Sequence, residues 1–232
     1  MTADPATGLP RAGFFDSGVG GVSVARAFLR LRPAAPVVYT ADWTFCPYGA
    51  RPDAEIRARA LEIGGALLGE HRCAMLVVAC NSASAVALDA LRAAHPGVPV
   101  VGMEPAVKPA AAMSRTGCVG ILATEHTLHG RLFRETAARH AAGVRVVAAV
   151  GEGFVELAEA GDVSSPAARA TVGRVLAPLV EARCDPVVLG CTHYPLLLPL
   201  LRSVAPGVRF LDPAEAVARR AAALWDALPR GA

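Results

Sequence analysis

Two stretches of the chain, Cys73–Ser82 (CAMLVVACNS) and Cys184–His193 (CDPVVLGCTH), decide the fold. Each contains a short aliphatic run that leads into a cysteine and then into polar residues. A run of this length and composition is typical of a strand buried on both faces of a parallel sheet. The two stretches correspond position by position, and the helices expected before them fall at the same offset.

Short Val-, Leu- and Ile-rich runs alternate with longer Ala-, Leu- and Arg-rich stretches along the rest of the chain. This alternation predicts βαβ units and parallel sheets. The predicted strands are Gly13–Phe15, Val37–Tyr39, Met75–Ala79, Val98–Gly102, Cys118–Ala123, Val144–Ala149, Pro186–Gly190 and Val208–Leu211. The predicted helices are Val22–Arg32, Ala54–His71, Ala83–Ala94, Thr127–His140, Pro166–Ala182 and Ala214–Leu228.

A further pair of matching segments, Gly13–Ser17 and Gly120–Thr124, supports duplication. We therefore expect two pseudo-symmetric, doubly wound α/β domains: residues 1–103 with 213–232, and residues 104–212. Ligands of such sheets bind at the carboxyl ends of the strands. Cys80 and Cys191 both follow a strand, so we expect one thiol on each side of an active-site cleft between the domains.

Composition excludes several other classes of protein. The 232 residues carry a formal charge of +3 with scattered arginines, which does not indicate nucleic-acid binding. We expect a cytoplasmic protein without a membrane span, because the sequence contains no secretory leader and no long apolar run. Its six cysteines are then expected to be reduced, and none lies in a C-x-x-C pair that would indicate a metal site.

Two opposed thiols suit racemisation. Inverting a stereocentre by proton transfer needs a base on one face of Cα and an acid on the other. Because the reaction is reversible, each group must act as the base in one direction and as the acid in the other. A thiol can do so because its ordinary pKa, about 8.5, can fall towards neutrality near a helix N-terminus. The other four cysteines fit a simpler interpretation as small core residues: Cys46, Cys73, Cys118 and Cys184.

Other routes to this chemistry have weaker support. A pyridoxal-phosphate enzyme needs a Schiff-base lysine, and the only lysine, Lys108, stands beside Pro109 in a proline-flanked segment. The segment Asp16–Gly21 (DSGVGG) follows a strand as a phosphate loop would, yet it matches neither nucleotide-binding pattern. Its amides and Ser17 could instead hold a carboxylate.

Five motifs in order resemble those of glutamate racemases in the aspartate/glutamate racemase superfamily. They are Asp16–Gly21 (DSGVGG), Pro47–Gly49 (PYG), Ala79–Ala85 (ACNSASA), Glu104–Pro109 (EPAVKP) and Gly190–Pro195 (GCTHYP). The resemblance implies cofactor-independent conversion of L-glutamate to D-glutamate, a supply of D-glutamate for peptidoglycan, and a homodimer.

The same resemblance implies roles for particular residues. Cys80 and Cys191 fall on the two catalytic cysteines, Asp16 on an acid that assists a thiol, His193 on a histidine that helps Cys191, and Glu159 on a further acid. The positions implied to bind glutamate are Asp16, Ser17, Tyr48, Gly49, Asn81, Ser82, Thr127, Thr192 and His193. No cofactor and no metal are implied.

Alternative interpretations remain open at this point. Ser82 stands where these racemases usually have threonine, so a relative acting on aspartate or a hydantoin is an alternative, as is a non-catalytic amino-acid-binding protein. Individual residues also have structural alternatives. Asp16 could cap a helix, His193 could be a buried structural histidine, Glu159 could be a solvated helix residue, and Tyr48–Gly49 could be a plain turn.

Overall fold

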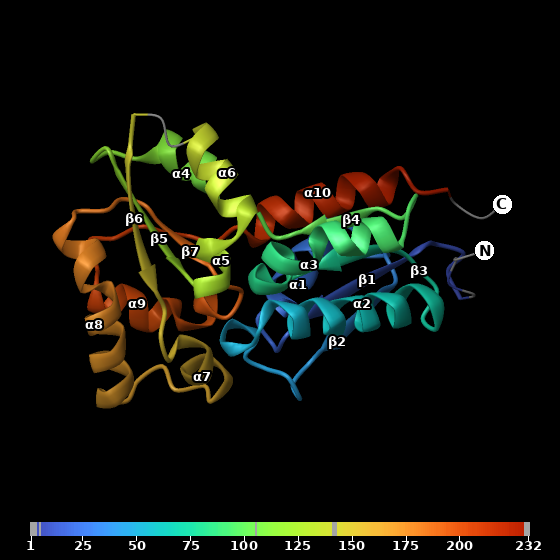
Figure 1. Cartoon of the computed structure of the whole chain (residues 1–232), viewed down its shortest axis with the longest axis horizontal. Helices are drawn as coiled ribbons and strands as arrows, with labels where there is room; N and C mark the ends of the chain where they lie inside the picture. Colours follow the sequence, from blue (N-terminus) through green and yellow to red (C-terminus); the bar gives the residue numbers. More distant parts are fainter. Residues whose placement is uncertain (1–3, 5, 105, 141–142, 230–232) are drawn as a thin grey trace. The chain divides into compact units, whose positions relative to one another are not determined.

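The computed structural model describes residues 4, 6–104, 106–140 and 143–229. The chain divides into two units, the first formed by residues 1–103 with 214–232 and the second by residues 104–213. Each unit contains a four-stranded parallel sheet with helices packed on it (Figure 1). The fold is therefore α/β with two parallel sheets, as predicted from the sequence.

The first unit has strand order β2-β1-β3-β4. Its strands are β1 (Arg11–Asp16), β2 (Val37–Ala41), β3 (Cys73–Val78) and β4 (Val100–Gly102). Its helices are α1 (Val22–Leu31), α2 (Asp53–Gly69), α3 (Asn81–Ala94) and α10 (Ala214–Asp226), with a 3-10 turn η1 at Tyr48–Ala50.

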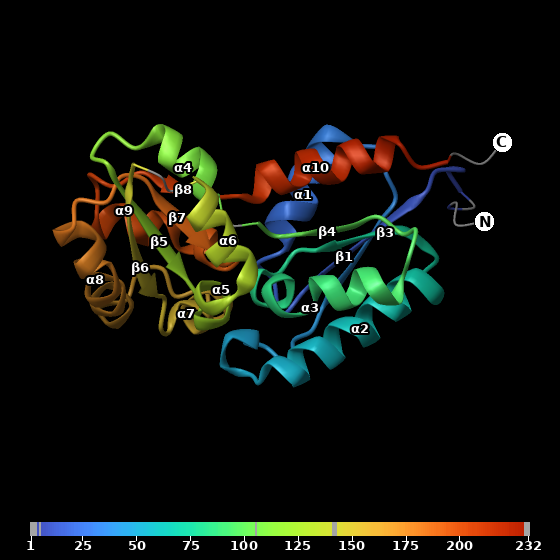
Figure 2. The same ribbon diagram turned by 45° about the horizontal axis from the view of Figure 1, so that its top comes forward.

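Alternate side chains of β1 enter the two cores of this unit, as the period of a strand requires. Phe14 packs with residues of α1 and α10 on one face, and Phe15 packs with residues of α2 and α3 on the other. Figure 2 shows these two helix pairs on opposite sides of the strands. Burial on both faces explains why the strands are almost entirely apolar in sequence.

Helix α10 returns the chain to the first unit after the second unit is complete. The Trp225 indole donates a hydrogen bond to the Pro10 carbonyl oxygen at 2.8 Å, and its ring meets Phe28 edge-on at 6.2 Å. Arg32 and Asp226 form an ion pair at the end of the same helix. The first unit is thus assembled from two separate segments of the chain.

The second unit has strand order β6-β5-β7-β8. Its strands are β5 (Cys118–Ala123), β6 (Arg145–Val150), β7 (Val187–Gly190) and β8 (Phe210–Leu211). Its helices are α4 (Val107–Met113), α5 (Glu125–His129), α6 (Arg131–His140), α7 (Phe154–Glu159), α8 (Pro166–Glu181) and α9 (Leu198–Val204), with a 3-10 turn η2 at Tyr194–Leu197. Taken in chain order, the strands repeat the arrangement of the first sheet, which supports the duplication inferred from sequence.

One predicted helix was wrong. The stretch 127–140 forms two helices, because Gly130 leaves the helical conformation at ψ 144° between α5 and α6. Glycine has little preference for a helix interior, so a break there is inexpensive. The structure also contains short helices that the sequence analysis did not predict: α4, α7 and α9. Pro109 and Pro199 lie near the starts of α4 and α9, where proline is tolerated.

Within the part of the chain that the structure describes, no helix is both long enough and apolar enough to cross a lipid bilayer.

Candidate active-site residues

In both sheets the chain reverses its winding direction between the first and third strands of the unit, at β1/β3 and at β5/β7. In open α/β sheets, ligands bind beyond the carboxyl ends of strands at this switch point. Asp16 ends β1 and Cys80 follows β3, while Thr124 follows β5 and Cys191 follows β7. Asp16, Cys80 and Cys191 therefore lie at the ends of the strands where sheets of this order bind their ligands.

Asp16 is fully buried and organises the loop that follows β1. Its Oδ2 accepts hydrogen bonds from the Gly21 amide at 2.9 Å and the Gly18 amide at 3.4 Å. A side chain on Gly21 would collide with the Asp16 Cβ and with the Ala79 carbonyl, so only glycine permits this close approach. Asp16 thus occupies the Gly18 and Gly21 amides, two of the loop amides that the sequence suggested could hold a ligand carboxylate.

Cys80 is the N-cap residue of α3 and is 4% exposed. Its Sγ accepts a hydrogen bond from the Ala83 amide at 3.5 Å and lies 3.9 Å from the Ser17 hydroxyl oxygen. An amide at a helix N-terminus favours negative charge on the atom to which it points. The position suits a thiol that must accept and return a proton.

Asn81, the next residue, is 4% exposed, and neither atom of its side-chain amide has a hydrogen-bond partner among the described residues. Leaving a buried polar atom without a hydrogen bond costs about 1–3 kcal/mol, so such atoms are uncommon in folded proteins. A polar ligand bound beside Cys80 would supply the missing hydrogen bonds. Ser82 is also buried, one residue further along α3.

Tyr48 and Gly49 form the start of η1, and Tyr48 is 2% exposed. The Tyr48 hydroxyl donates a hydrogen bond to Asp42 Oδ2 at 2.7 Å. Burial, and then Asp42, raise the pKa of Tyr48 well above its ordinary range, so the phenol stays protonated. The segment is therefore a turn whose tyrosine is buried and hydrogen-bonded to Asp42.

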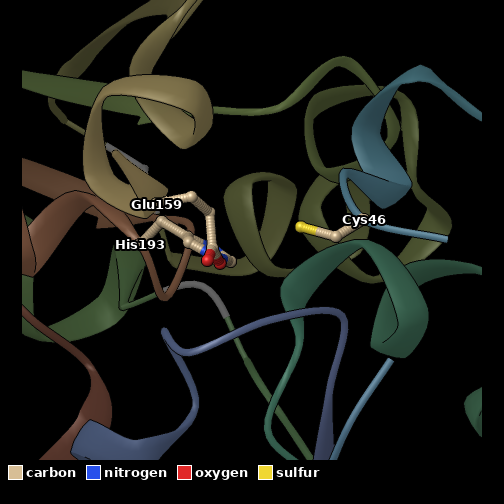
Figure 3. Close-up of side chains that lie close together, drawn as sticks. All are labelled: Cys46, Glu159 and His193. Atoms are coloured by element: carbon tan, nitrogen blue, oxygen red, sulfur yellow. The ribbon is translucent and has the colours of Figure 1, made fainter. Parts of the chain in front are cut away.

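In the second unit, three predicted residues are in contact in series: Cys191 with His193, and His193 with Glu159. Cys191 Sγ lies 3.9 Å from His193 Nδ1, and His193 Nε2 lies 2.5 Å from Glu159 Oε1. His193 is 1% exposed, and Figure 3 shows the Glu159 and His193 side chains pointing towards each other. An imidazole that donates its Nε2 proton to Glu159 presents Nδ1 to the thiol as an acceptor.

An aromatic pair stabilises the positions of His193 and Glu159. Tyr194 packs edge-on against Phe154, the first residue of α7, with ring centroids 5.2 Å apart. The Tyr194 hydroxyl donates to the Gly151 carbonyl oxygen at 3.4 Å, and a side chain on Gly151 would overlap the Tyr194 ring. Because α7 carries Glu159, these contacts fix the carboxylate relative to His193.

Two buried threonines accompany Cys191 in the second unit: Thr127 on α5 and Thr192. The Thr127 hydroxyl lies 3.0 Å from the Thr124 hydroxyl, and Thr124 caps α5 by accepting from the Thr127 amide at 3.4 Å. No role for Thr124, Asp42 or Tyr194 was predicted from the sequence. The sequence signal for Thr124 was its position three residues before Thr127 at the start of a helix, which is typical of an N-cap residue.

The remaining buried cysteines occupy a different setting. Burial raises the pKa of Cys73 to about 11, and burial together with the Cys118 thiol raises that of Cys184 to about 12. The Cys118 and Cys184 sulfur atoms lie 3.2 Å apart. Cys73 and Cys118 begin strands, and Cys184 precedes one, so all three lie at the opposite ends of the strands from Cys80 and Cys191. This buried position agrees with a role as core residues.

The aspartate, glutamate and hydantoin racemase family model matches residues 22–221 of the chain. The chain belongs to this racemase family. It is 46% identical over 211 residues to the glutamate racemase of Roseiflexus sp. (strain RS-1), covering 90% of this chain and 77% of that protein. It is 47% identical over 209 residues to that of Herpetosiphon aurantiacus, covering 90% and 82%.

Solved structures of racemases share the same fold. Escherichia coli glutamate racemase, in complex with L-glutamate and the activator UDP-MurNAc-Ala, superposes with a TM-score of 0.86 at 40% identity, covering 94% of this chain and 83% of that chain. The Thermus thermophilus glutamate racemase in complex with β-chloro-D-alanine gives a TM-score of 0.80 at 36% identity, covering 95% and 82%.

Proposed function

We propose that this member of the racemase family interconverts L- and D-glutamate without a cofactor, using the thiols of Cys80 and Cys191. The single observation that carries the proposal is the placement of each thiol just beyond the carboxyl end of a switch-point strand, with its own polar partner. The similarity to glutamate racemases at 46–47% identity supports glutamate as the substrate.

The proposed reaction is a 1,1-proton transfer that conserves atoms and charge. One cysteine, as thiolate, removes the proton from Cα and becomes a thiol, leaving a carbanion. The other cysteine, as thiol, donates its proton to the opposite face of Cα and becomes a thiolate. In the reverse direction the two exchange roles, so each needs an environment that tolerates both protonation states.

Different partners serve the two thiols in this proposal. His193 Nδ1 receives or returns the proton of Cys191, while Glu159 stabilises the imidazolium that forms. Asp16 assists on the side of Cys80, where it shapes the loop that carries Ser17. Each assignment follows from a contact within one unit of the chain.

Several polar residues remain for holding the substrate. Asn81 offers an unsatisfied amide beside Cys80 and is the strongest candidate for binding a carboxylate or the ammonium. The other proposed contacts come from Ser17, Tyr48, Gly49 and Ser82 in the first unit, and from Thr127, Thr192 and His193 in the second. A substrate with two carboxylates fits this abundance of buried hydrogen-bonding groups, most of them neutral.

The decisive experiment follows Cα exchange. The protein is incubated with L-glutamate in deuterated water without added cofactor, and D-glutamate and Cα deuterium are measured by chiral chromatography and NMR. We expect both to appear. The absence of both would refute the proposed activity, and a panel with aspartate and a hydantoin would identify a different substrate by a higher kcat/KM.

Cysteine variants test the mechanism. Cys80→Ser and Cys191→Ser should each lower the rate of racemisation by about 10²- to 10⁴-fold, the usual contribution of general acid–base catalysis. Cys118→Ser is the matched control, because Cys118 begins β5 and lies at the opposite end of that strand from Thr124. Near-full activity in either of the first two variants would overturn the two-thiol mechanism.

Three further features are proposed through the resemblance to glutamate racemases. The protein acts in the cytoplasm, forms a homodimer, and supplies D-glutamate for peptidoglycan synthesis. Light scattering on the purified protein tests the dimer, and rescue of a D-glutamate-requiring bacterial strain tests the metabolic role.

A further inference from the structure

A buried carboxylate lies beside the Tyr48 turn. Asp42 follows β2 and is 5% exposed, and its amide donates to the Asp16 carbonyl oxygen at 3.0 Å. Its own carbonyl oxygen accepts from the Phe45 and Cys46 amides, both at 3.1 Å. Asp42 thus connects the end of β1 to the segment that leads to Tyr48.

The Asp42 carboxylate receives three hydrogen bonds from two side chains. Tyr48 donates its hydroxyl to Oδ2 at 2.7 Å, while Arg59 of α2 donates Nε to Oδ2 at 3.1 Å and Nη2 to Oδ1 at 2.9 Å. A two-pronged contact between guanidinium and carboxylate fixes orientation as well as distance. Burying a carboxylate costs free energy unless it is paired and hydrogen-bonded, and these three hydrogen bonds supply that compensation.

Phe45 extends the connection to α2. Its ring lies beneath the Arg59 guanidinium at 4.3 Å and the Arg51 guanidinium at 5.0 Å from the ring centroid. Arg51 also donates Nε to the Phe45 carbonyl oxygen at 3.0 Å and pairs with Glu55 at 3.0 Å. Both ends of the turn are therefore anchored to a long, regular helix.

The hydroxyl of Tyr48 is committed to Asp42 and is buried. In the proposed racemase, Tyr48 and Gly49 contact the substrate. The remaining way for Tyr48 to serve the substrate is to hold the backbone of the turn in one place. The accuracy of that placement depends on Asp42 and Arg59, neither of which belongs to the proposed substrate site.

We propose that Asp42 and Arg59 are positioning residues that set substrate affinity by holding the Tyr48–Gly49 turn through the Tyr48 hydroxyl. The inference rests on the proposed function, because it concerns the affinity of that site for glutamate. A turn that moves away from the substrate loses hydrogen bonds that it makes equally to the bound substrate and to the transition state. Disrupting the contact should therefore raise KM for glutamate about 10- to 100-fold, while kcat changes little.

The test uses three variants of the full chain. Asp42→Asn keeps the shape and removes the charge, Arg59→Lys keeps the charge and removes the two-pronged geometry, and Tyr48→Phe removes only the hydroxyl. KM and kcat are measured in both directions, the Kd for D-glutamate is measured by calorimetry, and the melting temperature is followed in parallel. Glu62→Gln is the matched control, because Glu62 contacts Arg59 from a side chain that is 68% exposed.

A double-mutant cycle separates positioning from general stability. If Asp42 acts through the Tyr48 hydroxyl, the effects of Asp42→Asn and Tyr48→Phe on Kd will be strongly non-additive, and the double variant will resemble either single one. Loss of a merely structural contact would instead lower the folded fraction and leave Kd of the folded molecules unchanged.

The outcomes are distinct. Raised KM and Kd with kcat within about twofold, together with a non-additive cycle, support the inference. Unchanged Kd in folded Asp42→Asn, or an additive cycle, overturns it. If Asp42→Asn fails to fold, Arg59→Lys and Tyr48→Phe decide in the same way. Wild-type protein that binds D-glutamate without racemising it refutes the proposed activity, and the Kd values still decide the role of Asp42.

Discussion

The contact between Glu159 and His193 leads to a quantitative expectation. His193 is 1% exposed, and its Nε2 lies 2.5 Å from a Glu159 oxygen. Glu159→Gln retains an acceptor oxygen at nearly the same place and removes the negative charge. A hydrogen bond to a charged group contributes about 1.5–3 kcal/mol and a neutral one about 0.5–1.5 kcal/mol, so about 1–1.5 kcal/mol should be lost.

Solvent reduces this value, because the Glu159 side chain is 26% exposed. We therefore expect kcat/KM to fall about five- to tenfold in Glu159→Gln, since each 1.36 kcal/mol corresponds to a factor of about ten. Glu159→Ala removes the hydrogen bond completely and should cost about ten- to a hundredfold.

The assay is the initial rate of racemisation from each enantiomer. L- and D-glutamate have equal free energies, so kcat/KM must remain equal in the two directions for every variant, which provides an internal check. Glu156→Gln removes the same charge from the same helix at an exposed position and should leave the rate unchanged. Wild-type kcat/KM in Glu159→Ala would refute the assignment of Glu159 as the partner of His193.

Three further predictions concern packing and thiol reactivity. Gly21→Ala should destabilise the protein by about 1–3 kcal/mol and lower its activity, because the added Cβ would collide with Asp16; an unchanged melting temperature and rate would contradict this. Gly65→Ala, a change in the middle of α2 with nothing within 4 Å of the added Cβ, should stabilise it by about 0.5–1 kcal/mol in urea unfolding; a loss of stability would argue against open space there. The raised pKa values of Cys73 (about 11) and Cys184 (about 12) mean that their thiolates form only as the pH approaches those values, so at pH 8 iodoacetamide should label neither until urea unfolds the protein. Rapid labelling of either thiol in the folded state, read by mass spectrometry, would contradict the burial.

Features encoded locally were predictable from sequence. The strand Cys118–Ala123 was predicted with its observed bounds, because six consecutive small and aliphatic residues report burial on both faces directly. The position of Cys80 after a strand and before a helix followed from the same kind of signal. The helix break at Gly130 was missed, because a single glycine inside a helical pattern is tolerated as often as it terminates one.

Contacts between distant residues were less accessible. The partnership of Glu159 with His193 spans 34 residues, and sequence suggested Glu159 only through resemblance to a family. Asp42 and Arg59 lie 17 residues apart and belong to no motif that the sequence analysis recognised. A charged side chain has the same local pattern whether it faces solvent or a buried partner, so such pairs become visible only when the chain is folded.

The two-segment construction of the first unit also affects how the protein is made on the ribosome. The second unit is one continuous stretch, so Cys191, His193 and Glu159 can come together as soon as residues 104–213 have emerged. Phe28 and the face of β1 around Phe14 lack their cover until α10 has been synthesised and Trp225 has reached Pro10. The half of the protein that is made first is therefore the half that is completed last.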